Sequence, residues 1–309
     1  MAVLTLGLIE RGVMALSDPV TKFLPDFRPK LENGEAPVIT VRHLLTHTSG
    51  LRYRFFEPAG GSYEKADISD GMDIPGRTFA DNLARIASVP LAFPPGAAWA
   101  YSVAYDVLGA AIETATGKPL PDVMREGVTG PLGLGDTSFV VQARDRLSVA
   151  YADGSPEPVK MGAHHLVPFG PGNLSYAPDR MFNPASFPSG GGGMSGTAPN
   201  FLAFLEAIRQ GGAPVIGKSS VDALSKDAIG NMMVMGPGAT FSLGWSIVTD
   251  AALGAPQSLG TWRWGGVYGN SWFVDPARAL SVVVITNTAI AGMTGPFPDA
   301  VRDAIYLAL

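Results

Sequence analysis

Apolar residues fill nearly every position from Met1 to Ile9, in the stretch MAVLTLGLI. An apolar pattern on all sides predicts a helix that is buried all round, with Gly12 as its C-terminal stop. The stretch has neither the leading basic residues nor the small-residue cleavage site of a signal peptide, and it is too short to span a bilayer. It also starts without a capping residue, so the chain opens as if already inside a helix.

Further along, the helical period recurs between Gly- and Pro-rich loops. Residues 105–118, YDVLGAAIETATGK, predict a helix that ends at Gly117. Residues 197–212, TAPNFLAFLEAIRQGG, predict a helix capped by Thr197 and stopped at Gly211.

The remaining pattern divides into a region of loops and a region of strands. From residue 142 to 189 the chain is rich in Pro, Gly and Asp with weak periodicity, which predicts long loops. After residue 240 the segments become short, aromatic and β-branched, which predicts strands within 241–250, 260–269, 270–275 and 279–288. Their short connections indicate an antiparallel meander, and a closing helix over Pro298–Leu309 is expected to pack on that sheet.

Composition narrows the class of protein. Hydrophobic residues make up 46% of the 309 residues and charged residues 16%, which excludes a disordered chain. The net charge of −5 and the lack of a Lys/Arg cluster argue against partners such as nucleic acid or a membrane surface. The chain has no cysteine, so it has no disulfide, thiolate nucleophile or Cys-based metal site. This composition fits the cytoplasm.

The four histidines raise the possibility of a metal site. His43 and His47 are spaced i,i+4, which places both on one face of a helix, as in zinc-binding helices. The residues between them lack the glutamate of such proteases, and His164 and His165 lie in a predicted loop without an acidic cluster. We interpret all four as structural and expect no metal.

Two short motifs suggest chemistry but lack the right surroundings. Residues 191–196, GGGMSG, match a dinucleotide-binding string, but no apolar strand precedes them. They are more typical of a turn that lets the backbone pass close to another segment. Ser62-Tyr63-Glu64-Lys65 has the Ser-x-x-Lys spacing of a nucleophile pair, but no apolar run surrounds it to build a helix. We interpret this match as a coincidence.

Three stretches taken in order are more specific: ITVRHLLTHTSGL (39–51), FPPGAAWAYSVAYDVLGAAIETATGKPL (93–120) and WRWGGVYGNSWFVD (262–275). Together they resemble the serine hydrolases related to class C β-lactamases and DD-peptidases, closest to the carboxylesterase branch called family VIII. The resemblance extends over essentially the whole chain. It implies an α/β (α+β) fold in which helices flank an antiparallel sheet beside a mainly helical region. We therefore expect residues 1–35 and 186–309 to form the α/β region and residues 36–185 the helical and loop region.

Three motifs surround the site in that family. The first is Ser-x-x-Lys at the start of a central buried helix, where Ser is the nucleophile and Lys lowers its pKa. The second, Tyr-x-Asn, aligns with Tyr101-Ser102-Val103, which implies that Tyr101 is the acid/base. The third, Lys-Thr-Gly, aligns with Trp264-Gly265-Gly266. The resemblance also implies that the glycines let substrate lie against the strand and that the Val267 N–H is one oxyanion donor. It implies no cofactor.

Two departures from the family pattern indicate the substrate. Trp264 carries no charge and Val103 no hydrogen-bonding group. The chain therefore lacks both the positive charge and the side-chain amide that bind an anionic, peptide-like substrate in the β-lactamases and DD-peptidases. A tryptophan here resembles the esterase branch and favours neutral, small-molecule esters bound by apolar contact.

The first motif has no counterpart, because the opening residues resemble the middle of the central helix. We expect the nucleophile and its lysine to be missing from this chain, along with the strands that complete the sheet in the family, so that Met1 is a misassigned or truncated start. As given, the chain would then be inactive. A β-lactamase or DD-peptidase, and a non-catalytic relative acting as a binding module, remain alternatives to a carboxylesterase.

Overall fold

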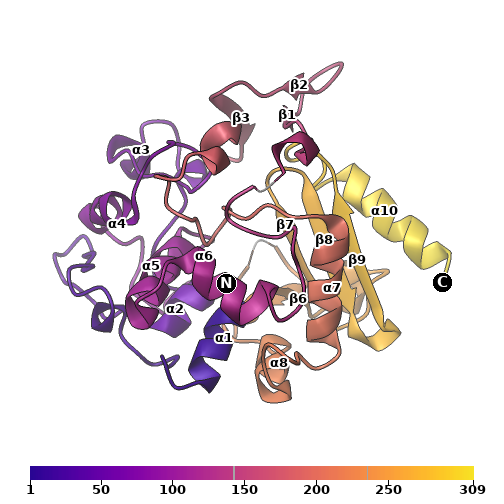
Figure 1. Ribbon diagram of the computed structural model, residues 1–309, viewed down its shortest axis with the longest axis horizontal. Coiled ribbons are helices and arrows are strands. Elements are labelled where there is room, and N and C mark those ends of the chain that lie inside the picture. The colour runs from indigo at the N-terminus through magenta and orange to yellow at the C-terminus, as the bar shows by residue number, and fades with distance from the viewer. Residues whose placement is uncertain (142, 235) are drawn as a thin grey trace. The chain divides into compact units, whose positions relative to one another are not determined.

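The computed structural model describes residues 1–141, 143–234 and 236–309 (Figure 1). Their contacts form two compact units. Unit 1 contains residues 1–131, 138–141 and 162–195, and unit 2 contains 132–137, 196–309 and 142–161 as far as these are described. The units group residues 1–35 with the helical part of the chain. The expected division, in which 1–35 joins 186–309, therefore differs from this grouping and stays a prediction of the resemblance.

Unit 1 is mainly helical. Its elements are α1 (Ala2–Glu10), α2 (Val41–Leu45), α3 (Ser62–Lys65), α4 (Phe79–Ser88), α5 (Ala104–Thr116), α6 (Leu120–Met124), the turns η1 (Val20–Lys22), η2 (Arg54–Phe56), η3 (Arg125–Thr129) and η5 (Pro178–Phe182), and the hairpin of β3 (His165–Phe169) and β4 (Gly172–Tyr176).

Two helices confirm the expectations drawn from the hydrophobic pattern. Helix α1 is buried from Ala2 to Leu8, and Gly12 follows it in the left-handed conformation. Helix α5 ends where Gly117 adopts φ +66°. A side chain at Gly109 would meet Leu120 at 2.9 Å, so this glycine allows α5 and α6 to pack closely.

Unit 2 is built around an antiparallel sheet. Its elements are η4 (Arg144–Arg146), β1 (Tyr151–Ala152), β2 (Val159–Lys160), α7 (Ala198–Arg209), α8 (Lys218–Leu224), β5 (Ala239–Phe241), β6 (Ser246–Val248), α9 (Ala251–Gly254), β7 (Trp262–Gly266), β8 (Asn270–Asp275), η6 (Pro276–Arg278), β9 (Leu280–Ile285) and α10 (Pro296–Leu307). The strand order β5-β6-β7-β8-β9 confirms the predicted antiparallel meander, but β5 was not predicted, because Ala239 and Thr240 precede the first expected strand segment.

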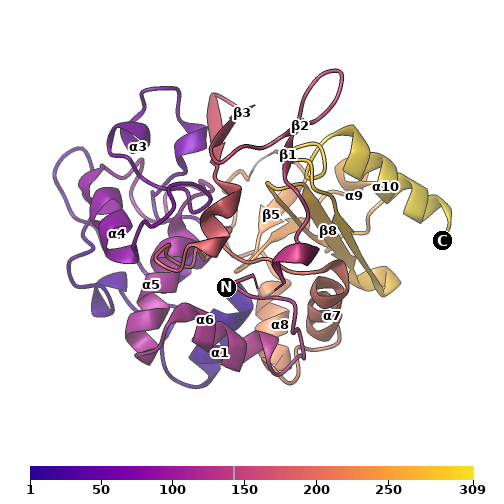
Figure 2. The same cartoon turned by 45° about the horizontal axis from the view of Figure 1, so that its top comes forward.

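Helices cover both faces of this sheet (Figure 2). Neighbouring strand residues point to opposite faces: Trp272 contacts Phe201 of α7, whereas Phe273 stacks on Tyr306 of α10. The Thr197 hydroxyl accepts a hydrogen bond from the Asn200 N–H, which confirms the predicted cap of α7. The closing helix packs on the sheet as expected, but it begins at Pro296, two residues before the predicted start.

The long loops predicted for 142–189 are partly wrong. Residues 151–160 form the small β1–β2 pair, and residues 165–176 form the β3–β4 hairpin. Pro168 lies within β3 and Gly172 opens β4, so the hairpin carries the residues that otherwise indicate loops. Pairing between the two strands outweighs the weak local preference.

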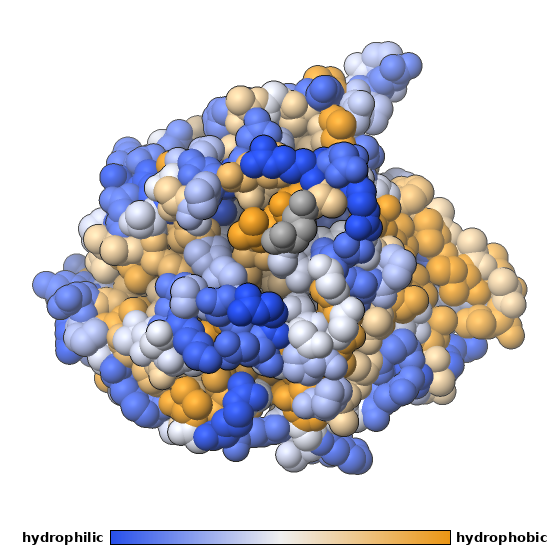
Figure 3. Space-filling view, viewed as in Figure 1, coloured by the Kyte–Doolittle hydropathy of each residue, from blue (hydrophilic) through white to orange (hydrophobic). Residues whose placement is uncertain are grey.

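The edge of the sheet at β9 carries apolar surface. The strand pairs with β8, and its residues from Leu280 to Val284 are half-buried. Side chains of α10 are exposed as well, Phe297 at 48% and Leu307 at 88%, and apolar residues gather over this helix in Figure 3. Among the described residues, no helix has the length and apolar character needed to cross a membrane.

Candidate active site

Tyr101 lies in unit 1, in the irregular segment that leads into α5. It is half-buried among aromatic rings. Its ring centroid lies 4.9 Å from that of Tyr53, 4.8 Å from that of His47 and 6.5 Å from that of Trp99. We call Tyr53, His47 and Trp99 the Tyr101 cage. The cage leaves part of the predicted acid/base exposed while restricting its ring.

Tyr53 also connects Tyr101 to buried acids. The two tyrosine side chains are hydrogen-bonded to one another. Burial raises the pKa of Tyr53, and the nearby Tyr101, Asp106 and Asp70 raise it further. Tyr53 therefore stays protonated and can serve Tyr101 as a neutral hydrogen-bonding partner.

Asp106 projects from the first turn of α5 and is fully buried. Its Oδ1 atom accepts hydrogen bonds from Ser189 Oγ at 2.7 Å and from the Gly191 N–H at 3.1 Å. Burial raises the pKa of Asp106 to about 6, against the opposing effect of the Ser189 hydrogen bond. Desolvation and Asp73 raise the pKa of Asp70, outweighing the nearby Arg54. The interior beside the cage therefore disfavours negative charge.

Ser102 and Val103 are both fully buried. Ser102 Oγ lies 3.2 Å from Nδ1 of His47. Val103 is the N-cap position of α5, and its N–H donates to the Arg52 carbonyl. Val103 thus anchors the start of the helix.

The expectation that His43 and His47 share one helix face is wrong. Helix α2 ends at Leu45, and His47 follows it with φ +54°. His43 caps the same helix, because its Nδ1 accepts from the Thr40 N–H. The two side chains thus have separate structural partners.

Trp264 lies in unit 2 on strand β7. Its half-buried ring meets Phe241 edge to face at 5.3 Å. Strand β7 pairs with β8 along its whole length. It pairs with β6 only at Trp262 and Arg263. The end of the strand from Trp264 onward therefore extends past this pairing with β6.

The two glycines after Trp264 have different surroundings. A side chain at Gly265 would meet Met293 at 2.6 Å and the Asn270 carbonyl oxygen at 3.2 Å. At Gly266 the nearest atom would be Asn270 Nδ2 at 3.3 Å. Val267 follows in a turn and is half-buried. Close contacts with Met293 and Asn270 thus explain Gly265, whereas the contact at Gly266 is less close.

The other sequence candidates lie in structural roles. Ser62–Lys65 forms a single helical turn, which the sequence had not indicated, but Ser62 and Lys65 are exposed and Ser62 Oγ donates to Glu57 at 2.8 Å. The glycine string follows Gly190, whose backbone passes close to the backbone of Tyr105. A Cβ atom added at Gly193 would lie 2.7 Å from the Ser189 backbone nitrogen. This confirms a turn with close backbone contact.

His165 begins strand β3, and His164 Nε2 lies 2.8 Å from Ser175 Oγ. No group of three or more His, Cys, Asp or Glu in the described part of the chain is placed to hold a metal.

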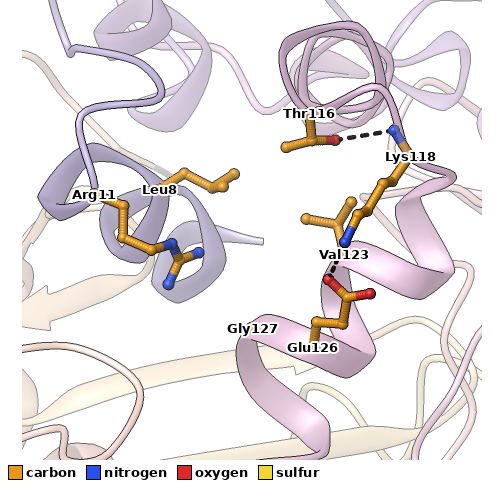
Figure 4. Close-up of a pocket in the computed structure, with 7 residues that line it drawn as sticks. All are labelled: Leu8, Arg11, Thr116, Lys118, Val123, Glu126 and Gly127. Carbon is orange, nitrogen blue, oxygen red and sulfur yellow. Dashed lines mark hydrogen bonds and ion pairs between the residues drawn. The ribbon is translucent and has the colours of Figure 1, made fainter.

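A separate cavity of about 340 Å³ lies in unit 1 (Figure 4). It is lined by Leu8, Arg11, Thr116, Lys118, Val123, Glu126 and Gly127. On one side of the cavity, Lys118 Nζ and Glu126 Oε2 form an ion pair at 2.6 Å. None of the residues predicted for catalysis lines this cavity.

Residues 1–305 match the Beta-lactamase family, so the chain belongs to that family. It is 47% identical over 310 residues to Esterase EstB of Burkholderia gladioli, an alignment that covers 99% of this chain and 79% of EstB. The solved structure of EstCE1, a hydrolase with promiscuous acyltransferase activity, superimposes with a TM-score of 0.95 at 40% identity, covering 99% of this chain and 81% of that one. These matches confirm the resemblance to serine hydrolases of the esterase branch.

A more distant structure supports the fold alone. A penicillin-binding protein from Bacillus halodurans superimposes with a TM-score of 0.68 at 19% identity, covering 100% of this chain and 83% of that chain. The expected fold class is therefore confirmed.

Three residues of the Tyr101 surroundings had not been singled out for catalysis: Tyr53, Asp106 and His47. His47 is the first residue of the HTSGL stretch and Tyr53 follows its end by two residues, so the resemblance of this stretch to the family was the available signal. Asp106 gave none, because its partner Ser189 is 83 residues away.

Proposed function

We propose that the protein is a carboxylesterase that hydrolyses neutral short-chain esters through an acyl-enzyme intermediate. The lysine of the Ser-x-x-Lys motif would favour the phenolate form of Tyr101. A serine hydroxyl attacks the ester carbonyl as its proton passes to this phenolate, and the neutral Tyr101 then gives the proton to the departing alcohol and becomes a phenolate again. Water then hydrolyses the acyl-enzyme by the reverse proton path. The Val267 N–H and the nucleophile's own N–H stabilise the oxyanion.

The observation that carries this proposal is the uncharged pair at the second and third motifs. Val103 is buried at the start of α5, and Trp264 packs on Phe241. Trp264 offers no charge and the Val103 side chain no hydrogen-bonding group to an anionic substrate. The relationship to Esterase EstB supports the same choice over a β-lactamase or DD-peptidase.

The nucleophile and its lysine are part of the proposal. Ser62 and Lys65 have the Ser-x-x-Lys spacing, but Ser62 is exposed and bonded to Glu57. We propose that the reacting serine is not among these 309 residues and that they alone are inactive. We also propose a cytoplasmic protein that acts on small molecules, which cell fractionation can test.

Labelling with a fluorophosphonate, followed by mass spectrometry, tests the reaction class. We expect no adduct on the 309-residue chain, and one serine adduct on the protein as its gene encodes it. An adduct on Ser62 contradicts our reading of that motif. A folded gene product without any adduct contradicts the enzyme and favours a binding module.

Substrate preference is tested on the same protein. We expect turnover of p-nitrophenyl acetate and butyrate, and no hydrolysis of benzylpenicillin. Efficient penicillin hydrolysis contradicts the argument from Trp264 and Val103.

A further inference from the structure

His47 contacts the segment that carries Tyr101 at several points. Its carbonyl accepts from the Ala100 N–H at 2.9 Å, and its Nδ1 lies 3.2 Å from Ser102 Oγ. Its ring meets Tyr101 edge-on at 4.8 Å and stacks on Tyr105 at 4.8 Å with an interplanar angle of 22°. Both the backbone and the side chain of one residue therefore define the path of residues 100–105.

The surroundings of His47 exclude a role as a charged group. The side chain is 1% exposed. Its ring lies among the rings of Tyr101, Tyr105 and Trp99. Burial lowers the pKa of His47 to about 3. The ring is neutral at any pH at which esterases are assayed, so it neither takes the proton from the nucleophile nor stabilises a phenolate by charge.

We propose that His47 is a positioning residue that fixes the Tyr101 ring, through ring packing and through its hydrogen-bonding contact with Ser102. The inference rests on the proposed function, because Tyr101 is taken as the acid/base. A proton transfer requires the donor and acceptor to stay within hydrogen-bond reach, so a tyrosine free to tilt transfers the proton less often.

The variants separate the two contacts. His47→Asn keeps a polar atom near the Nδ1 position and tolerates φ +54°, but it removes the ring. Ser102→Ala keeps the ring and removes the hydroxyl. The matched control is His43→Asn, in which the histidine that is lost caps α2.

We expect His47→Asn to lower kcat for p-nitrophenyl butyrate about 10- to 100-fold, with KM nearly unchanged and the pH profile of kcat unchanged in shape. Ser102→Ala should lower kcat by a smaller factor. His43→Asn should lower Tm but not kcat. If kcat per folded molecule of His47→Asn equals that of the wild type, His47 only stabilises the fold. If the acidic limb of the profile disappears, His47 is itself the base; both results overturn the proposal.

A measurement that needs no activity distinguishes failure of this inference from failure of the proposed function. With 3-fluorotyrosine in place of Tyr101, we expect one narrow ¹⁹F resonance in the wild type and a broadened or split one in His47→Asn. An unchanged resonance contradicts positioning, whether or not the protein hydrolyses esters. A changed resonance in a protein without esterase activity leaves the positioning intact and contradicts the proposed function alone.

Discussion

The Tyr101 cage in unit 1 and the end of strand β7 in unit 2 are held in place in different ways. Tyr101 lies outside regular structure, and side chains of Tyr53, His47 and Trp99 restrict it. The end of β7 is held by its backbone ladder to β8. Function in the cage should therefore depend on which side chains are present. Function at the strand should depend on side chains being absent, as at Gly266.

Removing the Tyr101 hydroxyl is expected to have the largest effect. Tyr101→Phe keeps the ring in its cage and removes the group that transfers the proton. We expect kcat for p-nitrophenyl butyrate to fall about 10³-fold, which corresponds to about 4 kcal/mol in the barrier. Steady-state kinetics on the protein as its gene encodes it, with circular dichroism to verify folding, measure this.

The matched control is Tyr105→Phe, since Tyr105 belongs to the same aromatic cluster and its hydroxyl donates to the Leu45 carbonyl at 3.2 Å. Loss of that hydrogen bond should lower the free energy of unfolding by about 1 kcal/mol and change kcat little. Equal kinetic effects of the two variants would mean that any hydroxyl in the cluster matters equally, and Tyr101 would lose its special role.

The same contrast explains what the sequence could predict. Periodicity is a local signal, so α1, α5, α7 and the strands β6 to β9 were predicted correctly, whereas β5 lies almost wholly before the predicted strand segments. The β3–β4 hairpin was missed because Pro168 and Gly172 are residues that usually indicate loops. The hairpin is stabilised by pairing between its two strands, which a local pattern does not reveal.

The cage was harder to predict than the strand. The family motifs point to Tyr101 and Trp264, but two of the three cage residues around Tyr101, His47 and Tyr53, come from a separate part of the chain. The spacing of His43 and His47 even suggested one helix face, because nothing local indicates that α2 ends at Leu45. Contacts between distant segments cannot be read from a single sequence.

Adding a methyl group to each glycine of β7 should have an intermediate effect. In Gly266→Ala the methyl group would lie 3.3 Å from Nδ2 of the Asn270 side chain, which can shift slightly, so stability should change little. The value of kcat/KM for short-chain esters should fall about 10-fold if substrate lies against this strand. Gly265→Ala forces Met293 to move and should lower the free energy of unfolding by about 1–3 kcal/mol. Ester kinetics and urea denaturation of both variants measure this.

The two glycine variants serve as controls for each other. Stability lost in Gly265→Ala with activity per folded molecule retained, and the reverse in Gly266→Ala, is the expected pattern. If Gly266→Ala keeps full kcat/KM towards esters of every chain length, the strand does not face the substrate at this position.

The smallest expected effect is on the free energy of unfolding and not on the rate. It tests whether the interior beside the cage excludes water. Burial disfavours the charge of the Asp106 carboxyl and raises its pKa in the folded protein to about 6, from the 3.8 of an ordinary aspartate. Between these values the folded state holds the proton more tightly than the unfolded state. Its contribution to stability is therefore complete below about pH 4 and lost as the pH rises through 6.

Urea denaturation at pH 5 and pH 7.5 measures this loss. We expect the Asp106 contribution to fall by about 1–2 kcal/mol over this range, and the neutral Asp106→Asn to remove that part of the decline, since its Oδ1 can still accept from Ser189 and Gly191. Asp70 acts in the same direction, because burial raises its pKa too, so some decline should remain. Glu32→Gln, at an exposed carboxyl of the same unit, should run parallel to the wild type. If the free energy of unfolding of Asp106→Asn falls with pH as steeply as that of the wild type, water reaches this carboxyl. The interior beside the cage would then be as accessible to solvent as the half-exposed end of β7.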